Sequence, residues 1–364
     1  MSDNTLNRRQ LLGSVGAVVG GASVALAQQG AKPAAPGTAK PAAAAPARPK
    51  LTIDSGARVA PVDEIVLIRE FEDSAKIKLP AAAFAVIAGT ERGAFDRITV
   101  RPRMMIPTMN MDLGVDLFGD RLFTPIVVGP VSEQKRFNPE AEVATARGAT
   151  AGKAALMVSS RSSVPIEQIA AEAKTPLWYQ VWAEADAKAL VQRAVKAGCR
   201  AVCVTLGAAP GAAAAVAEPD WAAIDGLRQG LSVPLMVKGI MTPAEAKTAL
   251  QHGAQAIVVS NWGGANKGAP ILALASIVDA VAGKVPVLVD GSFRLGVDIY
   301  KALAFGAQGV LIGRPAMWGL GAYGAVGVQT VVELLQGELG RTMGMCGNPN
   351  LKSLSRTFLT IHKQ

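Results

Sequence analysis

From residue 125 onward, short apolar runs alternate with longer, alanine-rich amphipathic stretches, and this alternation constrains the fold more than any other feature. The apolar runs are rich in β-branched residues, which favours strands, and the stretches between them have helical spacing. Strands that alternate with helices lie parallel in one sheet. We predict strands at Pro125–Gly129, Ala155–Val158, Trp178–Val181, Ala201–Thr205, Leu235–Lys238, Ala256–Ser260, Val285–Asp290 and Gly309–Ile312.

The number of these units predicts how the sheet closes. Helices are expected between the strands, for example at Ala185–Ala197, Pro243–His252 and Val297–Phe305, and a helical region should follow from Gly319. Eight βα units are the number that closes a (β/α)8 barrel, or TIM barrel. We therefore predict an α/β fold with one barrel domain over residues 51–364, with an open doubly wound sheet as the alternative.

Small, polar and cationic residues lie where the predicted strands end. In a barrel, the carboxyl ends of the strands carry the reactive groups. So many suitable residues at one edge are hard to explain by packing, and they predict a ligand site there. The strand ends read Gly129-Pro130, Ser159-Ser160, Gln180, Thr205, Lys238, Ser260-Asn261, Asp290-Gly291 and Gly313-Arg314.

The N-terminus has the pattern of an export signal. Arg8-Arg9 precede an apolar run that ends in Ala25-Leu26-Ala27. Paired arginines before such a run favour a twin-arginine signal peptide over residues 1–27 and export to the periplasm. A general secretory signal and an uncleaved membrane anchor are the alternatives. After cleavage of the signal, we expect no integral membrane span.

Residues 28–50 consist almost entirely of Ala, Pro, Gly, Lys and Gln, which predicts a disordered linker. The net charge of +9 is also concentrated near the N-terminus, since residues 1–50 hold six basic residues and one acidic residue, and the rest hold 31 and 27. A charge of about +4 on the barrel gives no reason to expect a nucleic-acid partner. Three cysteines, Cys199, Cys203 and Cys346, predict no disulfide framework, and we predict no metal site.

Two glycine- and arginine-containing turns predict a phosphate site. Asp290-Gly291-Ser292-Phe293-Arg294 follows the seventh strand, and Gly313-Arg314-Pro315 follows the eighth. Glycines allow backbone N–H groups to approach an anion, and arginines donate paired hydrogen bonds to phosphate oxygens. The loops after strands seven and eight form the usual phosphate site of such barrels. Simple glycine turns with surface arginines are the alternative.

Several motifs resemble the FMN-dependent α-hydroxy-acid oxidases and dehydrogenases, a family that includes lactate and glycolate oxidases. The likeness runs from near Glu70 almost to the C-terminus. Its motifs are Lys78-Leu79-Pro80, Phe95-Asp96-Arg97-Ile98, Asn138-Pro139-Glu140, Lys238-Gly239-Ile240, Ser260-Asn261-Trp262-Gly263-Gly264, Asp290-Gly291-Ser292-Phe293-Arg294, Gly313-Arg314-Pro315-Ala316-Met317-Trp318-Gly319 and Met343-Gly344-Met345-Cys346-Gly347.

The resemblance implies FMN as cofactor and assigns its contacts. It places Lys238 beside the N1 and C2 carbonyl edge of the flavin, where a cation tunes the ring. The isoalloxazine ring would contact Gly129, Pro130, Val131, Ser159, Gln180 and Thr205, and Ser260 is a further expected cofactor contact. The ribityl chain and phosphate would contact Asp290, Gly291, Ser292, Arg294, Gly313 and Arg314, with Ser292 in place of a usual glycine. The resemblance also implies a homotetramer.

The substrate side departs from the family pattern. The family's Ser-Asn-His-Gly-Gly-Arg motif supplies a base and a carboxylate-binding arginine, whereas this chain has Trp262 and Ala265 at those positions. An indole offers no basic nitrogen. Val86 and Trp182 stand where the family has tyrosines, and an alanine-rich stretch from Gly207 replaces a Gly-Arg-Arg sequence. A small α-hydroxy acid therefore has no evident binding site.

Other residues are poor candidates for the base. His252 ends a predicted helix and His362 is near the C-terminus, while Glu133, Lys135 and Lys267 lie in predicted loops. We therefore predict an FMN oxidoreductase with an altered, unidentified small-molecule substrate. A catalytically silent flavin-binding scaffold and a lactate-like 2-hydroxy-acid dehydrogenase with a different base are the alternatives.

Overall fold

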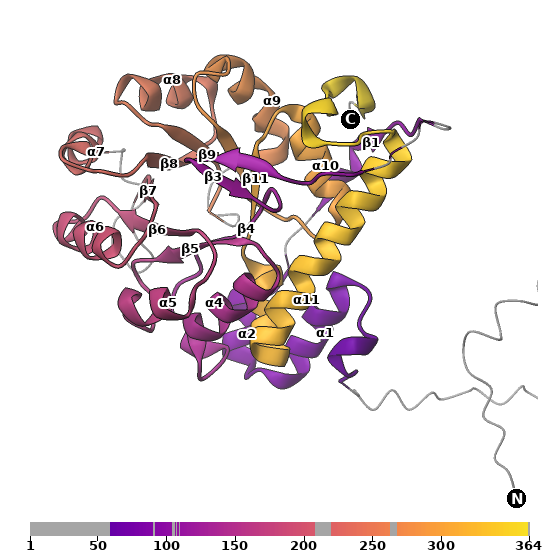
Figure 1. The fold of residues 1–364 in the computed structure, drawn as a ribbon, viewed down its shortest axis with the longest axis horizontal. Coiled ribbons are helices and arrows are strands. Elements are labelled where there is room, and N and C mark those ends of the chain that lie inside the picture. Colours follow the sequence, from indigo (N-terminus) through magenta and orange to yellow (C-terminus); the bar gives the residue numbers. More distant parts are fainter. Residues whose placement is uncertain are drawn as a thin grey trace, which may run out of the picture. The chain divides into compact units, whose positions relative to one another are not determined.

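The computed structural model describes residues 59–89, 92–103, 106, 108, 110–207, 220–262 and 268–362. The signal peptide predicted at 1–27 and the linker predicted at 28–50 lie outside these ranges. Eight parallel strands close a barrel in the order β10-β11-β4-β5-β6-β7-β8-β9 (Figure 1). The (β/α)8 prediction is confirmed, and the open-sheet alternative is wrong because β11 pairs with β4 and closes the sheet.

Each predicted strand is present, and its ends agree with the prediction or differ by at most two residues. The strands are β4 (Ile126–Val128), β5 (Ala155–Ser159), β6 (Leu177–Trp182), β7 (Ala201–Thr205), β8 (Leu235–Ile240), β9 (Ala256–Val259), β10 (Val287–Val289) and β11 (Gly309–Ile312). The crossover helices are α4 (Ala141–Ala151), α5 (Ile166–Glu172), α6 (Ala187–Lys196), α7 (Trp221–Arg228), α8 (Pro243–Gln251), α9 (Pro270–Val281) and α10 (Gly296–Phe305).

Local sequence explains where these helices begin. At α8, Thr242 Oγ1 accepts a hydrogen bond from Glu245 N at 3.2 Å, and Glu245 Oε2 accepts one from Thr242 N at 2.9 Å. This reciprocal cap satisfies two backbone donors that a helix leaves free, and Pro243 fits the first turn because it has no N–H to satisfy.

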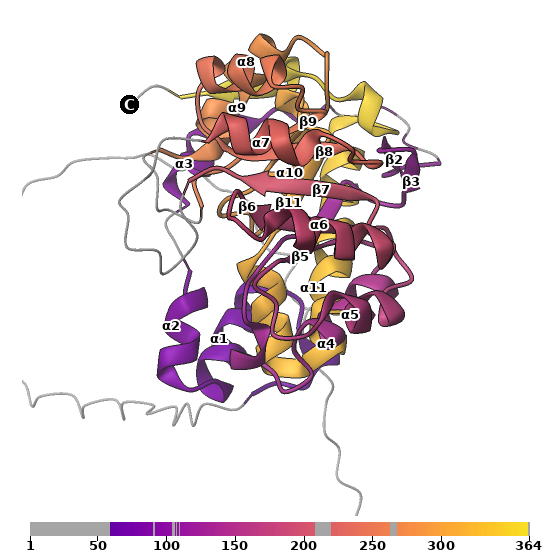
Figure 2. The same ribbon diagram turned by 90° about the vertical axis from the view of Figure 1, so that its left-hand side faces the viewer.

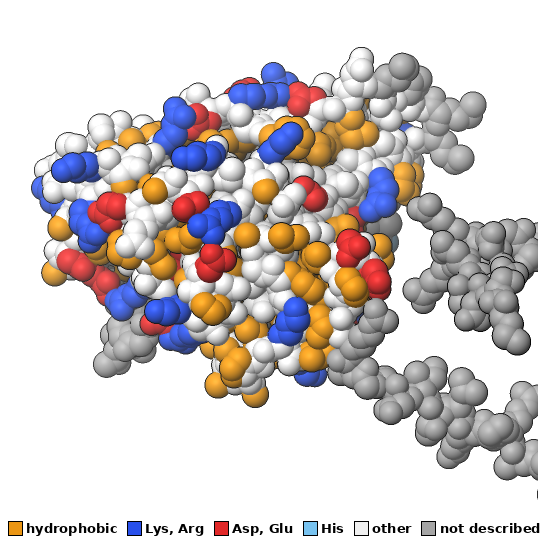
Figure 3. Space-filling view, turned by 60° about the horizontal axis from the view of Figure 1, so that its bottom comes forward, with side chains coloured by type: hydrophobic (Ala, Val, Ile, Leu, Met, Phe, Trp, Pro, Cys, Tyr) orange, Lys and Arg blue, Asp and Glu red, His pale blue; other side chains and the backbone are white. Residues whose placement is uncertain are grey.

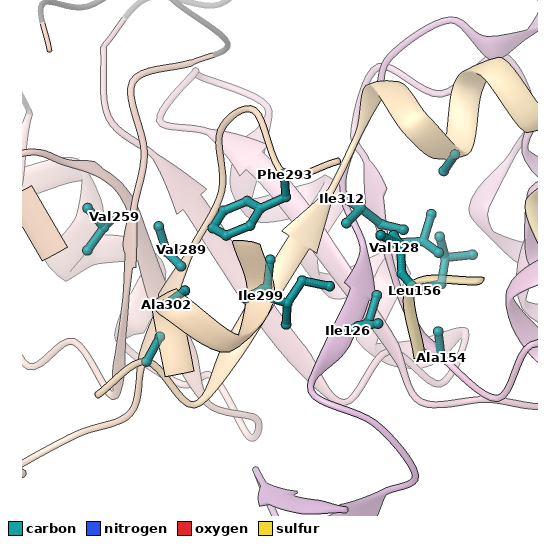
Figure 4. Packing of buried hydrophobic residues seen from close by; sticks show 14 of the residues in the cluster. Ile126, Val128, Ala154, Leu156, Val259, Val289, Phe293, Ile299, Ala302 and Ile312 are labelled. Carbon is teal, nitrogen blue, oxygen red and sulfur yellow. The ribbon is translucent and has the colours of Figure 1, made fainter. Parts of the chain in front are cut away.

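The barrel strands divide their side chains between two apolar clusters. One set, including Met157, Trp178, Cys203 and Met236, fills the barrel interior. The other set faces the helices, and Figure 4 shows its members Val128, Leu156 and Ile312 close together, with Phe293 and Ile299 from the neighbouring segments. Alternation along each strand produces this division. The interior is a packed core, so ligands can approach only at the barrel ends.

A short hairpin covers the amino-terminal end of the barrel. Its strands β2 (Val115–Leu117) and β3 (Asp120–Leu122) pair antiparallel, and Leu117 and Leu122 belong to the interior cluster. Phe118, in the turn, lies edge-on to Trp178 with ring centroids 5.2 Å apart. This closure directs any ligand site to the opposite end, where the strands terminate.

Segments outside the βα repeat pack on the barrel near the last helix (Figures 1 and 2). Tyr323 of α11 donates a hydrogen bond to Ala60 O at 2.6 Å, and Trp318 Nε1 donates one to Ile87 O at 2.7 Å. The remaining elements are η1 (Val62–Glu64), α1 (Ile68–Lys78), α2 (Ala81–Ile87), α3 (Gly93–Asp96), β1 (Ile98–Val100), η2 (Gln134–Arg136), α11 (Arg314–Cys346), η3 (Leu351–Ser353), η4 (Arg356–Phe358) and β12 (Leu359–Ile361).

The last helical region begins earlier than predicted. We expected it from Gly319, whereas α11 starts at Arg314, directly after β11, and is interrupted by non-helical backbone at Gly324. Pro315 lies in the first turn, a position that favours proline, so the helix can start at once. The correction matters because it places Arg314 at a helix N-terminus.

The described surface is mixed in charge. On the face in Figure 3, Lys and Arg side chains are interspersed with Asp and Glu. None of the described helices is both long and apolar enough to cross a membrane. Within the described ranges, no cluster of His, Cys, Asp and Glu is placed to hold a metal ion. The three cysteines are free and buried, and burial raises the pKa of Cys199 and of Cys203 to about 12.

Candidate active site

A chain of hydrogen bonds joins three neighbouring strand ends inside the mouth of the barrel. Ser159 on β5 donates to Gln180 Oε1 on β6 at 3.1 Å, and Gln180 Nε2 donates to Thr205 Oγ1 on β7 at 2.9 Å. The hydroxyl oxygen of Ser132, in the loop after β4, lies 3.1 Å from Ser159 Oγ. The buried side chains of Ser159, Gln180 and Thr205 therefore hold one another in fixed orientations.

Lys238 joins the next three strands in the same way. Its Nζ lies 2.8 Å from Ser260 Oγ and 2.9 Å from Asp290 Oδ2, and only 7% of the residue is exposed. A buried ammonium needs such partners because removal from water is costly. The other carboxylate oxygen, Asp290 Oδ1, is buried without a hydrogen-bond partner in the described structure. It is therefore available to accept a hydrogen bond from a ligand.

Two arginines meet beyond β10 and β11. Arg294 is 8% exposed and lies over the Trp318 ring at 4.4 Å from the ring centroid. Its Nη1 donates to Phe293 O at 2.9 Å, whereas its Nη2 is buried and finds no partner among the described residues. Burial and the nearby charge of Arg314 lower the pKa of Arg294 to about 10, and burial lowers the pKa of Arg314. A buried arginine beside a half-buried one gives this end of the barrel the positive charge that an anion site needs.

Backbone geometry around the arginines also suits an anion. Gly313 precedes the first turn of α11 without a side-chain cap, so the positive end of this helix faces the same loops. Gly291 has a φ of 105°, and a Cβ there would lie 3.0 Å from Pro270 Cγ, so glycine is required. Ser292 has a φ of 61°, a left-handed conformation that explains why glycine is usual at this position.

The loop after β4 borders both halves of the site. Gly129 N donates to Ile312 O at 2.8 Å, which ties the end of β4 to β11. Val131 lies beside Gly313, because a Cβ on that glycine would be 3.5 Å from Val131 Cγ2. Gly129, Pro130 and Val131 therefore lie between the hydrogen-bonded strand ends and the arginine pair.

Sequence reasoning missed the residues that position Arg294. Asp298 on α10 accepts hydrogen bonds from Arg294 N and Leu295 N, each at 3.0 Å, and lies 2.6 Å from Arg92 Nη2. An acidic residue three positions inside a helix start is a recognisable capping signal, so Asp298 could have been found. Its partnership with Arg92, 206 positions away in sequence, carries no local signal.

Trp262 lies just past the end of β9 in a left-handed conformation with a φ of 56°. A Cβ on Gly207 would lie 2.6 Å from its Cη2, and one on Gly239 would lie 2.9 Å from its Nε1, so the indole packs directly against both glycines. Its Nε1 is buried without a hydrogen-bond partner in the described structure. The ring therefore presents an N–H donor and an aromatic wall near Lys238 and Ser260.

Both histidines lie away from the strand ends. His252 caps the C-terminus of α8, bonds Asp225 at 2.9 Å and stacks on Trp221, as expected for a helix end. His362 follows β12 and lies 2.7 Å from Thr99 Oγ1. Glu133 pairs with Arg136, and Lys135 is exposed. Lys267 and Ala265 lie outside the described residues.

The two remaining substitutions on the substrate side differ in burial. Trp182 is 8% exposed, and its Nε1 is buried without a partner in the described structure. Val86 is 56% exposed on α2. Trp182 is thus part of the barrel mouth, whereas in the described structure Val86 presents a largely open surface.

Taken together, the fold and this geometry define a barrel that binds a phosphorylated cofactor after its last two strands. A family model described as FMN-dependent dehydrogenase matches residues 81–212 and 208–361. The chain therefore belongs to the FMN-dependent dehydrogenase family, and its cofactor is FMN.

Relatives of known activity support this membership. The chain is 32% identical to glycolate oxidase of Spinacia oleracea over 81% of its own length and 96% of the relative. It is 34% identical to L-lactate oxidase of a Nostoc species, covering 80% and 97%. A solved structure of mandelate oxidase with 3,3-difluoro-2-hydroxy-3-phenylpropionic acid matches with a TM-score of 0.76 and 33% identity, covering 82% and 100%.

Proposed function

We propose that the protein is an FMN-dependent oxidoreductase whose substrate site is altered, so that it is not a standard L-2-hydroxy-acid oxidase. The observation that carries this proposal is the indole of Trp262, packed against Gly207 and Gly239 at the end of β9. By resemblance, a histidine base belongs at this position. An indole nitrogen donates a hydrogen bond but does not accept a proton, so the reaction has lost its expected base.

The described residues fit FMN. Arg294 and Arg314, with the backbone at Gly291 and Gly313, would hold the phosphate, and Ser292 adjoins them. Asp290 Oδ1, which lacks a partner in the described structure, suits a ribityl hydroxyl. The ring would lie against Gly129, Pro130, Val131 and the strand-end residues Ser159, Gln180, Thr205 and Ser260, with Lys238 at its N1 and C2 carbonyl edge. When bound, FMN supplies a group that accepts two electrons from a substrate.

The protein side chains then have limited roles. Lys238, held by Asp290 and Ser260, provides a fixed positive charge in a site shielded from water. Trp262 and Trp182 exclude water and provide N–H donors. No histidine lies at the described strand ends, so a substrate whose oxidation needs proton removal by imidazole is disfavoured.

The test is anaerobic mixing of the purified, FMN-loaded protein with L-lactate, glycolate and mandelate. We expect no bleaching of the flavin by these acids and full bleaching by dithionite. Rapid bleaching by any of the acids would show that a different base operates and that the altered-site proposal is wrong. A colourless protein that takes up no FMN would overturn the proposal at its foundation.

A gain-of-function variant tests whether Trp262 and Ala265 account for the lost hydroxy-acid oxidation, and a donor screen separates an altered site from a silent scaffold. Trp262→His combined with Ala265→Arg restores the two family residues, and we expect it to be bleached by at least one of the three acids. A broader donor screen on the unaltered protein then asks which substrate it oxidises. Failure of every donor would favour the scaffold alternative.

We also propose export through the twin-arginine pathway to the periplasm and assembly as a homotetramer. The support is the Arg8-Arg9 pattern at residues 1–27 and the family resemblance, respectively. Fractionation of cells producing the protein tests the location. Light scattering of the purified holoprotein measures the oligomeric state, and a monomer would contradict the tetramer.

A further inference from the structure

A further cation, Arg161, lies at the mouth of the barrel beside the residues proposed to hold the flavin. Arg161 comes directly after β5, two residues beyond Ser159, and its N–H donates to Ser159 Oγ at 3.2 Å. Its carbonyl oxygen accepts a hydrogen bond from Glu133 N at 2.9 Å. These two bonds fix the backbone of Arg161 between the loops after β4 and β5, on the side of the barrel where the strands end.

The side chain of Arg161 lies over a residue of the barrel mouth. Trp182 is on the same face of β6 as Gln180, because side chains two apart in a strand share a face. Gln180 bonds Ser159 and Thr205 within the mouth, so Trp182 also faces it. The Arg161 guanidinium carbon is 5.9 Å from the Trp182 ring centroid, within cation–π range.

Glu184 pairs with the guanidinium of Arg161, but it uses only some of the N–H donors. Its Nη2 bonds both carboxylate oxygens of Glu184, at 2.8 and 3.1 Å. Its Nε and Nη1 have no hydrogen-bond acceptor among the described residues. The side chain is 43% exposed, so a dissolved anion can reach it. Nη1 points away from Glu184 and keeps its hydrogens free in the described structure, so the guanidinium can donate a further charge-assisted hydrogen bond to an anion.

We propose that Arg161 supplies the contact to the substrate carboxylate that this chain lacks at Ala265, where the family pattern has an arginine. This inference rests on the proposed function, because it concerns the substrate side of the same flavin site. Trp182, beneath the guanidinium, would contact the apolar part of the molecule. Glu184 would compete with the substrate for Arg161 and so limit its affinity.

The experiment uses unreactive probes in matched pairs, acetate with acetamide and benzoate with benzamide, on the FMN-loaded protein. Each pair has nearly the same shape and differs in charge. Binding is measured by calorimetry and by the change in flavin absorbance. Loss of a charge-assisted hydrogen bond should weaken acetate or benzoate binding in Arg161→Met about tenfold or more, with less than about twofold change for the amides.

Two further variants test the roles assigned to Arg161 and Glu184. Arg161→Lys should retain part of the preference for the anion, and Glu184→Gln should tighten anion binding because the competing carboxylate is gone. Arg147→Met is the matched control, since Arg147 is 45% exposed and pairs with Glu140 and Glu172 on the outer helices. It should leave all four probes unaffected.

The inference is overturned if Arg161→Met binds the anions as the unaltered protein does, if it weakens amide and anion equally, or if the unaltered holoprotein binds neither anion. These outcomes are independent of the hydroxy-acid test, because no probe is oxidised. Bleaching by lactate would refute the altered site and leave the role of Arg161 standing. A retained FMN content and an unchanged melting temperature in Arg161→Met exclude simple unfolding.

Discussion

At the scale of single residues, the cofactor site lowers the stability of the folded protein when FMN is absent. Arg294 is buried, and both its burial and the charge of the half-buried Arg314 disfavour its protonated form. The pKa of Arg294 is about 10 when folded, below its ordinary value of 12.5. The folded state therefore binds this proton less tightly than the unfolded chain. This destabilisation is complete below about pH 10 and shrinks as the pH rises from there towards 12.5.

We predict that Arg314→Met lowers FMN affinity while leaving the cofactor-free protein at least as stable. One charge-assisted contact to phosphate is lost, which corresponds to about 10- to 100-fold in dissociation constant. Repulsion of Arg294 is also removed. Fluorescence titration with FMN and thermal melts of the cofactor-free protein measure the two effects. A marked fall in the melting temperature of the cofactor-free variant would show that the arginine is structural.

The same pair predicts a pH effect on cofactor binding. FMN phosphate should bind the doubly charged pair, so affinity should be constant from pH 8 to 9 and fall as the pH passes about 10. Arg314→Met should show the fall at higher pH, because one of the two cations that lower the pKa of Arg294 is removed and only Arg92 remains. A flat profile to pH 11 in the unaltered protein would contradict this reading.

Lys238 provides a second prediction at the scale of a residue. Replacing it with Met removes the buried cation proposed to lie beside the flavin N1, so sulfite should bind the holoprotein more weakly. Because Asp290 would then lose its partner 2.9 Å away, stability should also fall. Spectrophotometric sulfite titration measures the first effect. An unchanged sulfite affinity would show that Lys238 does not lie beside the flavin N1.

Among the elements, α11 requires glycine at particular positions because its two parts pack closely. Gly324 has a φ of 64° and a ψ of −142°, which interrupts the helix. The two parts then approach so closely that Gly319 and Gly327 meet backbone to backbone, where no side chain fits. The first part carries Arg314 and Trp318, so this packing holds the anion site in place.

We predict that Gly327→Ala destabilises the protein by about 1–3 kcal/mol, because its methyl group would overlap the Gly319 carbonyl. Gly337→Ala, in the same helix and with open space around it, is the control, and should stabilise by about 0.5–1 kcal/mol. Melting temperatures of both variants, with FMN bound, give the comparison. If the two variants had the same melting temperature, the two parts of α11 could move apart at little cost in stability.

At the scale of the whole molecule, the core of the described residues forms one closed barrel with the segments that pack on it. Among the described residues, the first buried side chains are Ile65 and Ile68, and the interior cluster lies within residues 115–311. We therefore predict that removal of residues 1–50 leaves the melting temperature and the FMN content of the purified protein unchanged. A lower FMN occupancy would assign the N-terminal segment a role in cofactor loading.

The export signal is tested separately in cells. Arg8→Lys combined with Arg9→Lys preserves charge but removes the arginine pair, so export by the twin-arginine route should stop and precursor should accumulate. The control for the general secretory route is a variant in which the apolar run after Arg9 is altered and both arginines are kept. Unaltered export of the double-lysine variant would favour that route.

The sequence by itself determined the fold class, the eight strands and the arginine-bearing loops. These follow from local patterns, because strand periodicity, glycine turns and helix starts depend on residues close together in the chain. The tertiary structure decided which distant groups meet: Lys238 with Asp290, Arg92 with Asp298, Trp262 with two glycines, and Arg161 with Trp182. Such pairings arise only when the barrel closes and brings separate strand ends to one face.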